Sequence, residues 1–143
     1  MNMGEARIEE LHAMVLDHGS TILNVGNPQC AVFVDHFDFD WRTLGATIER
    51  LAQFPNRTNV SFVKRIDDHT LDVRFFERGA GETMSSGTGS TGAAAAALAR
   101  GLVTSPVRVL TPAGPLDLRW ENNSILLAGP AEIVAAGEFY WDA

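Results

Sequence analysis

The segment Glu77–Gly101, ERGAGETMSSGTGSTGAAAAALARG, decides the fold of this 143-residue chain. A glycine-rich loop runs directly into an alanine-rich stretch that predicts a helix at about 88–100. The residues of this helix are Ala, Leu, Thr and Gly nearly all round, and a helix without a polar face is buried on most sides. Small side chains let strands approach its backbone closely. We therefore predict an α+β fold in which a mostly antiparallel sheet curls around this central helix.

The rest of the chain supplies the strands and one further helix. Leu44, Ile48 and Leu51 recur at i, i+4 and i+7, which predicts an amphipathic helix over 41–54 outside the sheet, ended by Pro55. Short apolar or alternating runs separated by turn residues predict strands. These strands are expected as a pair within 20–35, at 60–66 and 70–76, as a pair within 106–120, and at 125–127 and 132–141.

Composition narrows the classes of function. The net charge of −7 and pI near 4.9 argue against nucleic acid or an anionic membrane as partner. No apolar run approaches the roughly 18 residues needed to span a bilayer. The single cysteine, Cys30, allows no intrachain disulfide and indicates a reducing cytoplasm. The four histidines show no metal-ligand spacing, so no metal site is expected.

The start of the alanine-rich helix is a candidate anion site. The first N–H groups of a helix have no partner within it, and the helix dipole places positive charge there. Gly87–Gly92 literally matches the dinucleotide pattern GxGxxG, but no strand directly precedes it and too little chain follows. A phosphate-binding loop would need a lysine after the glycine, and the only lysine is Lys64. From the residues alone, a glycine turn that merely packs the helix stays open.

Four ordered motifs resemble the carboxy-terminal half of the diaminopimelate epimerase family. They are NVGNPQC at 24–30, FPNRTNV at 54–60, ERGAGET at 77–83 followed by SGTG at 86–89, and AGPA at 128–131. The resemblance implies that residues 1–143 form one domain equivalent to that half, with the amino-terminal catalytic half absent. It also implies inversion of an amino-acid α-carbon without pyridoxal phosphate or another cofactor, in the biosynthesis of lysine and peptidoglycan precursors. One cysteine from each half exchanges the proton in that family.

The resemblance also assigns roles to single residues. Glu77 and Arg78 would hold the distal, non-reacting end of a diaminopimelate-like substrate, with hydrogen bonds from Asn27 and Asn59. The backbone of Gly87 and Thr88 would hold the reacting α-carboxylate. We expect these amides and Arg78 to line one open pocket.

Two positions depart from the family pattern. Ser86 stands where the family has its catalytic cysteine, and a serine hydroxyl needs a neighbouring base, for which Glu82 is a candidate. Gln29 stands where the family usually has histidine. Cys30 matches an apolar strand position and is expected to be buried in packing rather than to replace the missing thiol.

Three functions remain open at this stage. The first is an epimerase domain, inactive as an isolated chain, with Ser86 at the catalytic position. The second is a dehydratase-type relative on the same fold, which needs only one base. The third is an amino-acid-binding domain without catalysis. An exposed face toward the absent half predicts a homodimer or pairing with that half.

Overall fold

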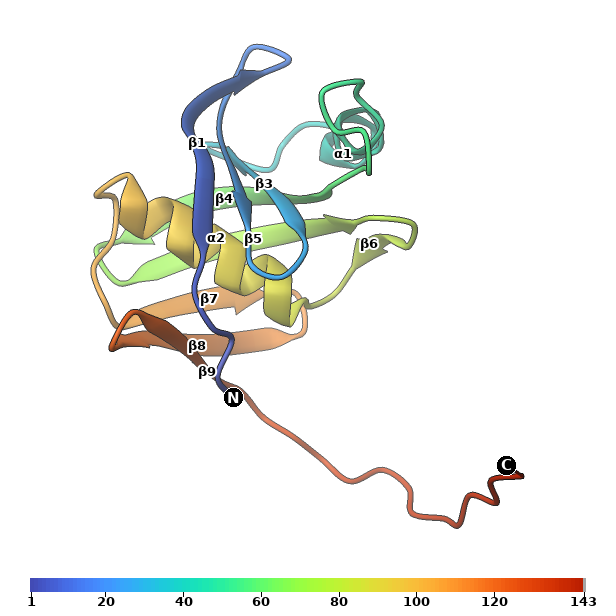
Figure 1. Ribbon diagram of the computed structural model, residues 1–143. Helices are drawn as coiled ribbons and strands as arrows, with labels where there is room; N and C mark the ends of the chain where they lie inside the picture. The colour runs from blue at the N-terminus through green and yellow to red at the C-terminus, as the bar shows by residue number, and fades with distance from the viewer. Residues whose placement is uncertain (143) are drawn as a thin grey trace.

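The structure is a computed structural model that describes residues 1–142 (Figure 1). Two helices and nine strands are found in these residues. In chain order they are β1 (Arg7–Val15), β2 (His18–Asn24), β3 (Pro28–Phe33), α1 (Trp41–Glu49), β4 (Asn59–Asp67), β5 (Thr70–Glu77), β6 (Gly81–Thr83), α2 (Gly87–Ala99), β7 (Val107–Thr111), β8 (Gly114–Glu121) and β9 (Ser124–Ala128). The expected α+β class is confirmed.

All nine strands belong to one sheet in the order β1-β2-β3-β4-β5-β7-β8-β9, with β6 paired to β5. Most neighbouring strands are antiparallel, and only β3 with β4 and β5 with β7 run parallel among the described residues. A parallel pair needs a crossover connection, and the two helices lie in these two connections. The amino-terminal segment also reaches β9, where the Met3 amide donates to the Ile125 carbonyl at 2.8 Å. The sheet therefore curls back toward its own first strand.

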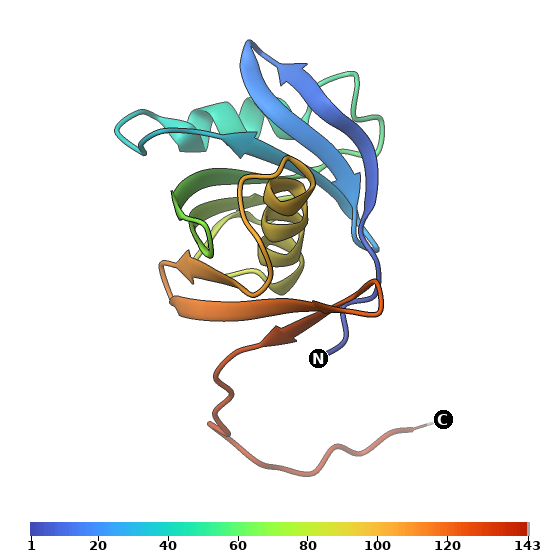
Figure 2. The ribbon, with the colours of Figure 1, turned by 90° about the vertical axis from the view of Figure 1, so that its left-hand side faces the viewer.

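Helix α2 occupies the inside of this curled sheet (Figure 2). It contacts strands β1 to β5 and β7 to β9, and nine of its thirteen residues are buried. Two glycines allow the closest approaches: a Cβ added at Gly89 would lie 2.8 Å from Phe75 Cδ1, and one at Gly92 would lie 3.1 Å from Gln29 Cγ. The small residues of α2 thus let side chains of the sheet pack directly on the helix backbone.

Helix α1 packs on the outer face of the same sheet. Asp40 caps its first turn by accepting a hydrogen bond from the Thr43 amide at 3.1 Å. Trp41 and Ile48 pack in a second core that includes Phe62, whose ring centre lies 5.8 Å from that of Trp41. Because strand residues alternate between the two faces, β4 contributes Phe62 to the outer core and Val63 to the α2 core.

One sequence prediction about where an element ends is wrong. The helix expected over 41–54 ends at Glu49, and the chain continues through turns to residue 54. In these turns the Leu51 amide donates to the Ile48 carbonyl, and the Phe54 amide donates to the Leu51 carbonyl. Apolar periodicity persists through such turns, so it does not mark where a helix ends.

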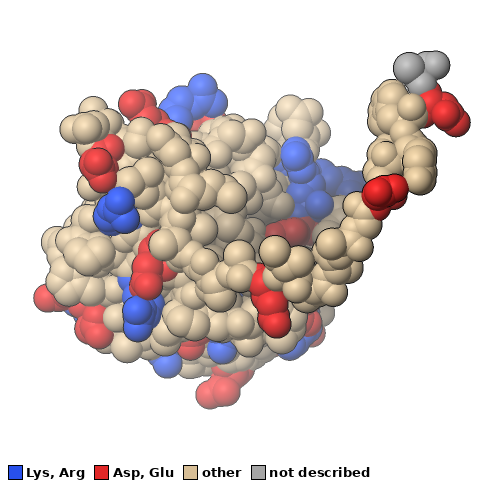
Figure 3. Space-filling model, turned by 90° about the horizontal axis from the view of Figure 1, so that it is seen from below, with Lys and Arg blue, Asp and Glu red and all other residues tan. Residues whose placement is uncertain are grey.

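The strand expected at 132–141 is not formed. Residues 129–142 have no regular structure, are exposed, and stand away from the body in the view from below (Figure 3). A strand needs a neighbour to bond with, and apolar residues alone do not supply one. Conversely, β1 and β6 were not anticipated from the sequence, because β1 carries a mixed polar pattern and β6 has only three residues.

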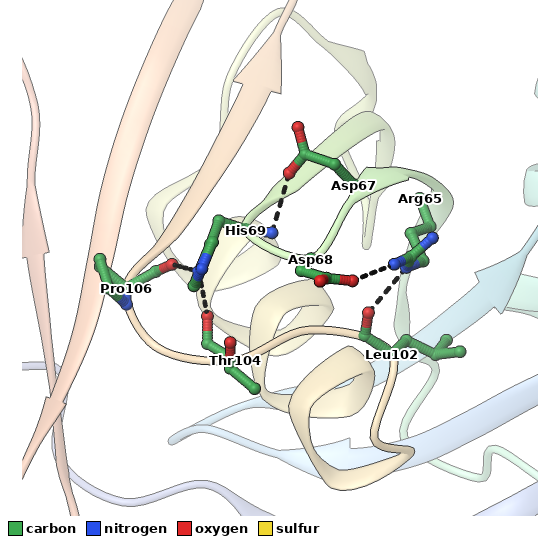
Figure 4. Close-up of polar contacts among 7 residues, drawn as sticks. All are labelled: Arg65, Asp67, Asp68, His69, Leu102, Thr104 and Pro106. Carbon is green, nitrogen blue, oxygen red and sulfur yellow. Dashed lines mark hydrogen bonds and ion pairs between the residues drawn. The ribbon is translucent and has the colours of Figure 1, made fainter.

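His69 connects the β4–β5 turn to the loop between α2 and β7 (Figure 4). Its Nδ1 lies 2.9 Å from the carbonyl oxygens of both Thr104 and Pro106, and its amide donates to Asp67 at 2.8 Å. The two carbonyl oxygens, with smaller contributions from the neighbouring carboxylates, raise the pKa of His69 above its usual value of 6.5. The protonated ring is therefore the form that this contact favours.

Arg65 makes a second connection between the same two segments. Its Nε donates to the Leu102 carbonyl at 2.7 Å, and its guanidinium is paired with Asp68. These contacts fix the loop that follows α2 to the β4–β5 turn. This turn lies at the carboxy-terminal end of α2, opposite the end where the helix begins. Neither helix in residues 1–142 is long and apolar enough to cross a membrane.

We predict that Gly89→Ala destabilises the protein by about 1–3 kcal/mol, because the new methyl group would overlap Phe75. Gly87→Ala is the matched control, since a Cβ at Gly87 meets no atom within 4 Å. Chemical unfolding of both variants measures the difference. Equal stabilities for the two variants would show that the sheet does not pack as tightly on α2 as described.

We predict that the contact of His69 stabilises the fold fully below the usual pKa of 6.5 and less as the pH rises through the higher folded pKa. His69→Gln should therefore flatten the decline of the unfolding free energy over this interval. Unfolding curves at several pH values measure the slope, and His12→Gln, which changes an exposed residue of β1, should keep the wild-type slope. A wild-type slope in His69→Gln would contradict the assignment.

Candidate functional site

Three of the four sequence motifs, those at 24–30, 54–60 and 77–89, meet at one end of the sheet. Strand β3 begins beside β4, with Gln29 opposite Asn59, and β5 ends beside the start of β4, with Phe76 opposite Val60. The turn between β2 and β3 reaches the first turn of α2 (Figure 1), where Asn27 Nδ2 lies 3.4 Å from Thr88 Oγ1. Residues far apart in sequence thereby share one end of the molecule.

Asn59 joins two of these segments through its side-chain amide. Its Nδ2 donates to the Pro28 carbonyl at 3.1 Å, and its Oδ1 accepts from the Arg78 amide at 2.8 Å. Asn59 therefore sets the position of the turn that carries Arg78. Its expected contact with a substrate remains a prediction.

Arg78 and Glu77 lie where β5 ends. The Arg78 side chain is exposed, and one of its guanidinium nitrogens donates to the Asn56 carbonyl at 3.1 Å. Glu77 is half-buried and pairs with Gly81 across the β5–β6 hairpin. A carboxylate and a cation therefore follow one another in the chain where β5 ends.

Glu49, which the sequence analysis did not single out, holds the turn after Arg78. Its buried carboxylate accepts from the Gly79 amide at 2.8 Å and lies 3.7 Å from the Arg57 guanidinium. A carboxylate at the last residue of a helix interacts unfavourably with the helix dipole. This unfavourable position is the signal in the sequence that could have pointed to Glu49. The two partners explain why an acid is placed there.

A cavity of about 930 Å³ opens beside Arg78. It lies between the outer face of β1 and β2 and the loop over residues 53–58. Asn24 and Pro28 line it, whereas Asn27, from the same turn, points to Thr88. Residues 86–88 are not part of the lining, so the single pocket expected to join Arg78 to the start of α2 is not formed within residues 1–142. The β2–β3 turn stands between the two features.

The start of α2 has the geometry expected of an anion site. We call the backbone amides of Gly87 and Thr88 the amide cradle. Within residues 1–142, neither amide donates a hydrogen bond, and Gly87 is exposed. The next amide, that of Gly89, is satisfied by Ser86. Two N–H groups at the positive end of a buried helix therefore remain open to an acceptor.

Ser86 acts as the cap of α2. Its Oγ accepts from the Gly89 amide at 2.9 Å, and the side chain is only 8% exposed. Glu82, the candidate base, instead forms a two-bond ion pair with Arg42 at 2.5 and 2.8 Å, which lowers the pKa of the carboxyl group. Among the described residues Glu82 forms no hydrogen bond with Ser86, and its ion pair with Arg42 makes the carboxylate a weaker base. The expectation that Glu82 assists Ser86 therefore gains no support.

Cys30 is fully buried in the outer core, as expected. Burial raises the pKa of its thiol to about 12, so it stays protonated and unreactive. Within the described residues, no group of three or more His, Cys, Asp or Glu side chains could hold a metal ion.

Comparison with known proteins agrees with the motifs. The sequence profile of the family described as "Diaminopimelate epimerase" matches residues 21–134. The diaminopimelate epimerase of Herminiimonas arsenicoxydans is 41% identical over 124 residues, which is 85% of this chain and 44% of that protein. The diaminopimelate epimerase of Aromatoleum aromaticum is 44% identical over 121 residues, covering 82% of this chain and 44% of that protein. The chain thus spans less than half the length of these relatives.

Solved structures show a similar fold. A PhzF-family phenazine biosynthesis protein of Bacillus anthracis superposes with a TM-score of 0.54 at 22% sequence identity, over 81% of this chain and 37% of that chain. A PhzF-family protein of Enterococcus faecalis gives a TM-score of 0.50 at 15% identity, over 85% of this chain and 42% of that chain. At these identities the likeness concerns the fold.

We predict that Ser86→Ala lowers the unfolding free energy by about 0.5–2 kcal/mol, because the Gly89 amide loses its buried acceptor. Ser85→Ala is the neighbouring control, and because Ser85 is exposed its effect should stay within about 0.5 kcal/mol. Denaturant unfolding compares the two. Indistinguishable stabilities would rule out the cap as the main role of Ser86 in the folded chain.

Proposed function

The chain belongs to the diaminopimelate epimerase family, and from this premise we propose that it forms the substrate-binding half of a cofactor-independent amino-acid epimerase site. The substrate class is a diaminopimelate-like amino acid, and the reaction belongs to the making of lysine and peptidoglycan precursors. The observation that carries the proposal is the amide cradle, placed beside Asn27 at the start of a buried helix.

The cradle suits the reacting end of such a substrate. Two open amides and the helix dipole stabilise an α-carboxylate, and they stabilise it more when removal of the α-proton spreads negative charge into that group. The resemblance assigned Asn27 to the distal end, but its Nδ2 donates to Thr88 Oγ1 at 3.4 Å, so we propose that the second N–H of this amide is a third donor at the reacting end. These donors are held in place by the packing of α2, so they need no rearrangement when charge develops.

Arg78 and Glu77 suit the distal end. An arginine pairs with a carboxylate through two parallel hydrogen bonds, and a glutamate accepts from an ammonium group. Asn59 fixes the backbone of Arg78, and Glu49 fixes the next amide, so this pair is presented from a rigid turn. The β2–β3 turn lies between the cradle and the cavity at Arg78, and a diamino diacid bound in this way spans that turn.

Proton transfer needs groups other than those of this chain. Ser86 uses its oxygen to cap α2, Glu82 is paired with Arg42, and Cys30 is buried, so none of the three is placed to take an α-proton. We propose that the complementary half of the site comes from a second unit, either the other half seen in the longer relatives or a second copy of this chain. On its own the chain would bind and orient an amino acid without catalysing its epimerisation.

We predict that the chain binds diaminopimelate in a calorimetric titration and that Arg78→Ala weakens binding about ten- to a hundredfold, because a charge-assisted pair is lost. Arg119→Ala on β8 is the control, since Arg119 is exposed and lies outside the site. Absence of saturable binding by the wild-type chain, or equal affinities of the two variants, would reject the assignment of Arg78.

We predict no exchange of the substrate α-proton with deuterium oxide by the wild-type chain, because Ser86 lacks a base. In Ser86→Cys, a thiol at the helix start has a lowered pKa, and slow exchange that increases with pH is expected. Proton NMR of diaminopimelate follows the signal. Exchange by the wild-type chain at the rate of Ser86→Cys would show that Ser86 itself transfers protons.

A further inference from the structure

We infer that Gln29 is a positioning residue that fixes the side-chain amide of Asn27 so that its Nδ2 lies on the side of Thr88, where it donates to Thr88 Oγ1 next to the amide cradle. The expected effect of Gln29 on substrate affinity rests on the proposed function. The geometry behind it stands on contacts within the protein.

Gln29 is a buried polar residue, and packing alone does not explain why a polar side chain is placed there. It is 2% exposed, and its Oε1 has no hydrogen-bond partner among the described residues. A buried carbonyl oxygen without a partner destabilises a fold, and an apolar side chain of the same length would remove that penalty. Its other polar atom, Nε2, donates to Asn27 Oδ1 at 2.8 Å. The hydrogen bond from Nε2 to Asn27 is therefore the advantage that glutamine has over an apolar residue at this position.

That donor determines which way the Asn27 amide faces. The two ends of an asparagine amide have nearly the same shape, but one end only accepts and the other only donates hydrogen bonds. Gln29 Nε2 must meet the oxygen, so Nδ2 turns to the opposite side and lies 3.4 Å from Thr88 Oγ1. The flipped amide would present an oxygen to the cradle and repel a carboxylate.

Helix α2 is shaped to accept Gln29. A Cβ at position 92 would lie 3.1 Å from Gln29 Cγ and 3.3 Å from its Cβ, so the glycine at 92 leaves room for this side chain against the helix. Gln29 also occupies β3 opposite Asn59, which positions Arg78. The residue thus sits between the two halves of the proposed site, in contact with the helix that forms the cradle.

The first experiment separates positioning from packing. Gln29→Met keeps the length of the side chain but removes both polar atoms. We expect the melting temperature to be unchanged or higher and the affinity for diaminopimelate to fall about tenfold, the equivalent of one hydrogen bond to a charged group. Ser90→Ala is the control. It also removes a buried oxygen without a hydrogen-bond partner, in this case on α2, and it should leave the affinity unchanged. A wild-type affinity in Gln29→Met, or a loss of stability together with affinity, overturns the inference.

The second experiment needs no ligand. In the wild-type chain, NMR should show proximity between the Asn27 side-chain amide hydrogens and the Thr88 methyl group, and this signal should disappear in Gln29→Met. If the signal persists unchanged in the variant, the inference is overturned whatever the ligand. If the signal depends on Gln29 but the wild-type chain does not bind diaminopimelate, the proposed function fails while the positioning of Asn27 by Gln29 holds.

Discussion

The sheet contacts α2 from nearly every side and buries it, and the remaining elements are arranged around this packing. Because the helix has almost no side-chain bulk, the sheet packs on its backbone, and Gly89 and Gly92 take Phe75 and Gln29 directly against it. Such packing leaves little freedom for the helix to slide or turn. The first amides of α2 are therefore held rigidly at one end of the sheet, which is the condition for an anion site that does not need to reorganise.

The pairing of β4 with its two neighbours decides which residues join that end. The crossover through α1 returns the chain so that β3 and β4 start together, and the antiparallel β4–β5 pair brings the end of β5 beside them. Side chains there bond mainly to backbone groups of neighbouring segments: Asn59 to Pro28 and Arg78, and Glu49 to Gly79. The polar groups of this region are thus divided between a supporting set, which is buried or half-buried, and a set left free to meet a ligand.

In the proposed site, binding and proton transfer would depend on different groups. Stabilising a carboxylate requires only donors and positive charge, which the helix start and Arg78 provide. Removing a proton from carbon requires a base of suitable pKa beside it. Burial keeps the Cys30 thiol protonated, Arg42 makes Glu82 a weaker base, and Ser86 spends its oxygen on the helix. Ser86, which stands at the position of the family's catalytic cysteine, caps α2 through the Gly89 amide.

The central helix, the outer helix and most hairpins could be predicted from the sequence, because they depend on local periodicity and on turn residues. The ordered motifs also drew attention to Asn27, Asn59, Arg78 and Thr88. Three features became known from the folded chain: α1 ends at Glu49, residues 129–142 find no strand partner, and the β2–β3 turn separates the cavity at Arg78 from the amide cradle. The hydrogen bonds of Gln29 and Glu49 were likewise seen there first. Strand pairing, cavities and side-chain hydrogen bonds join residues distant in sequence, and a local pattern carries no record of the partner.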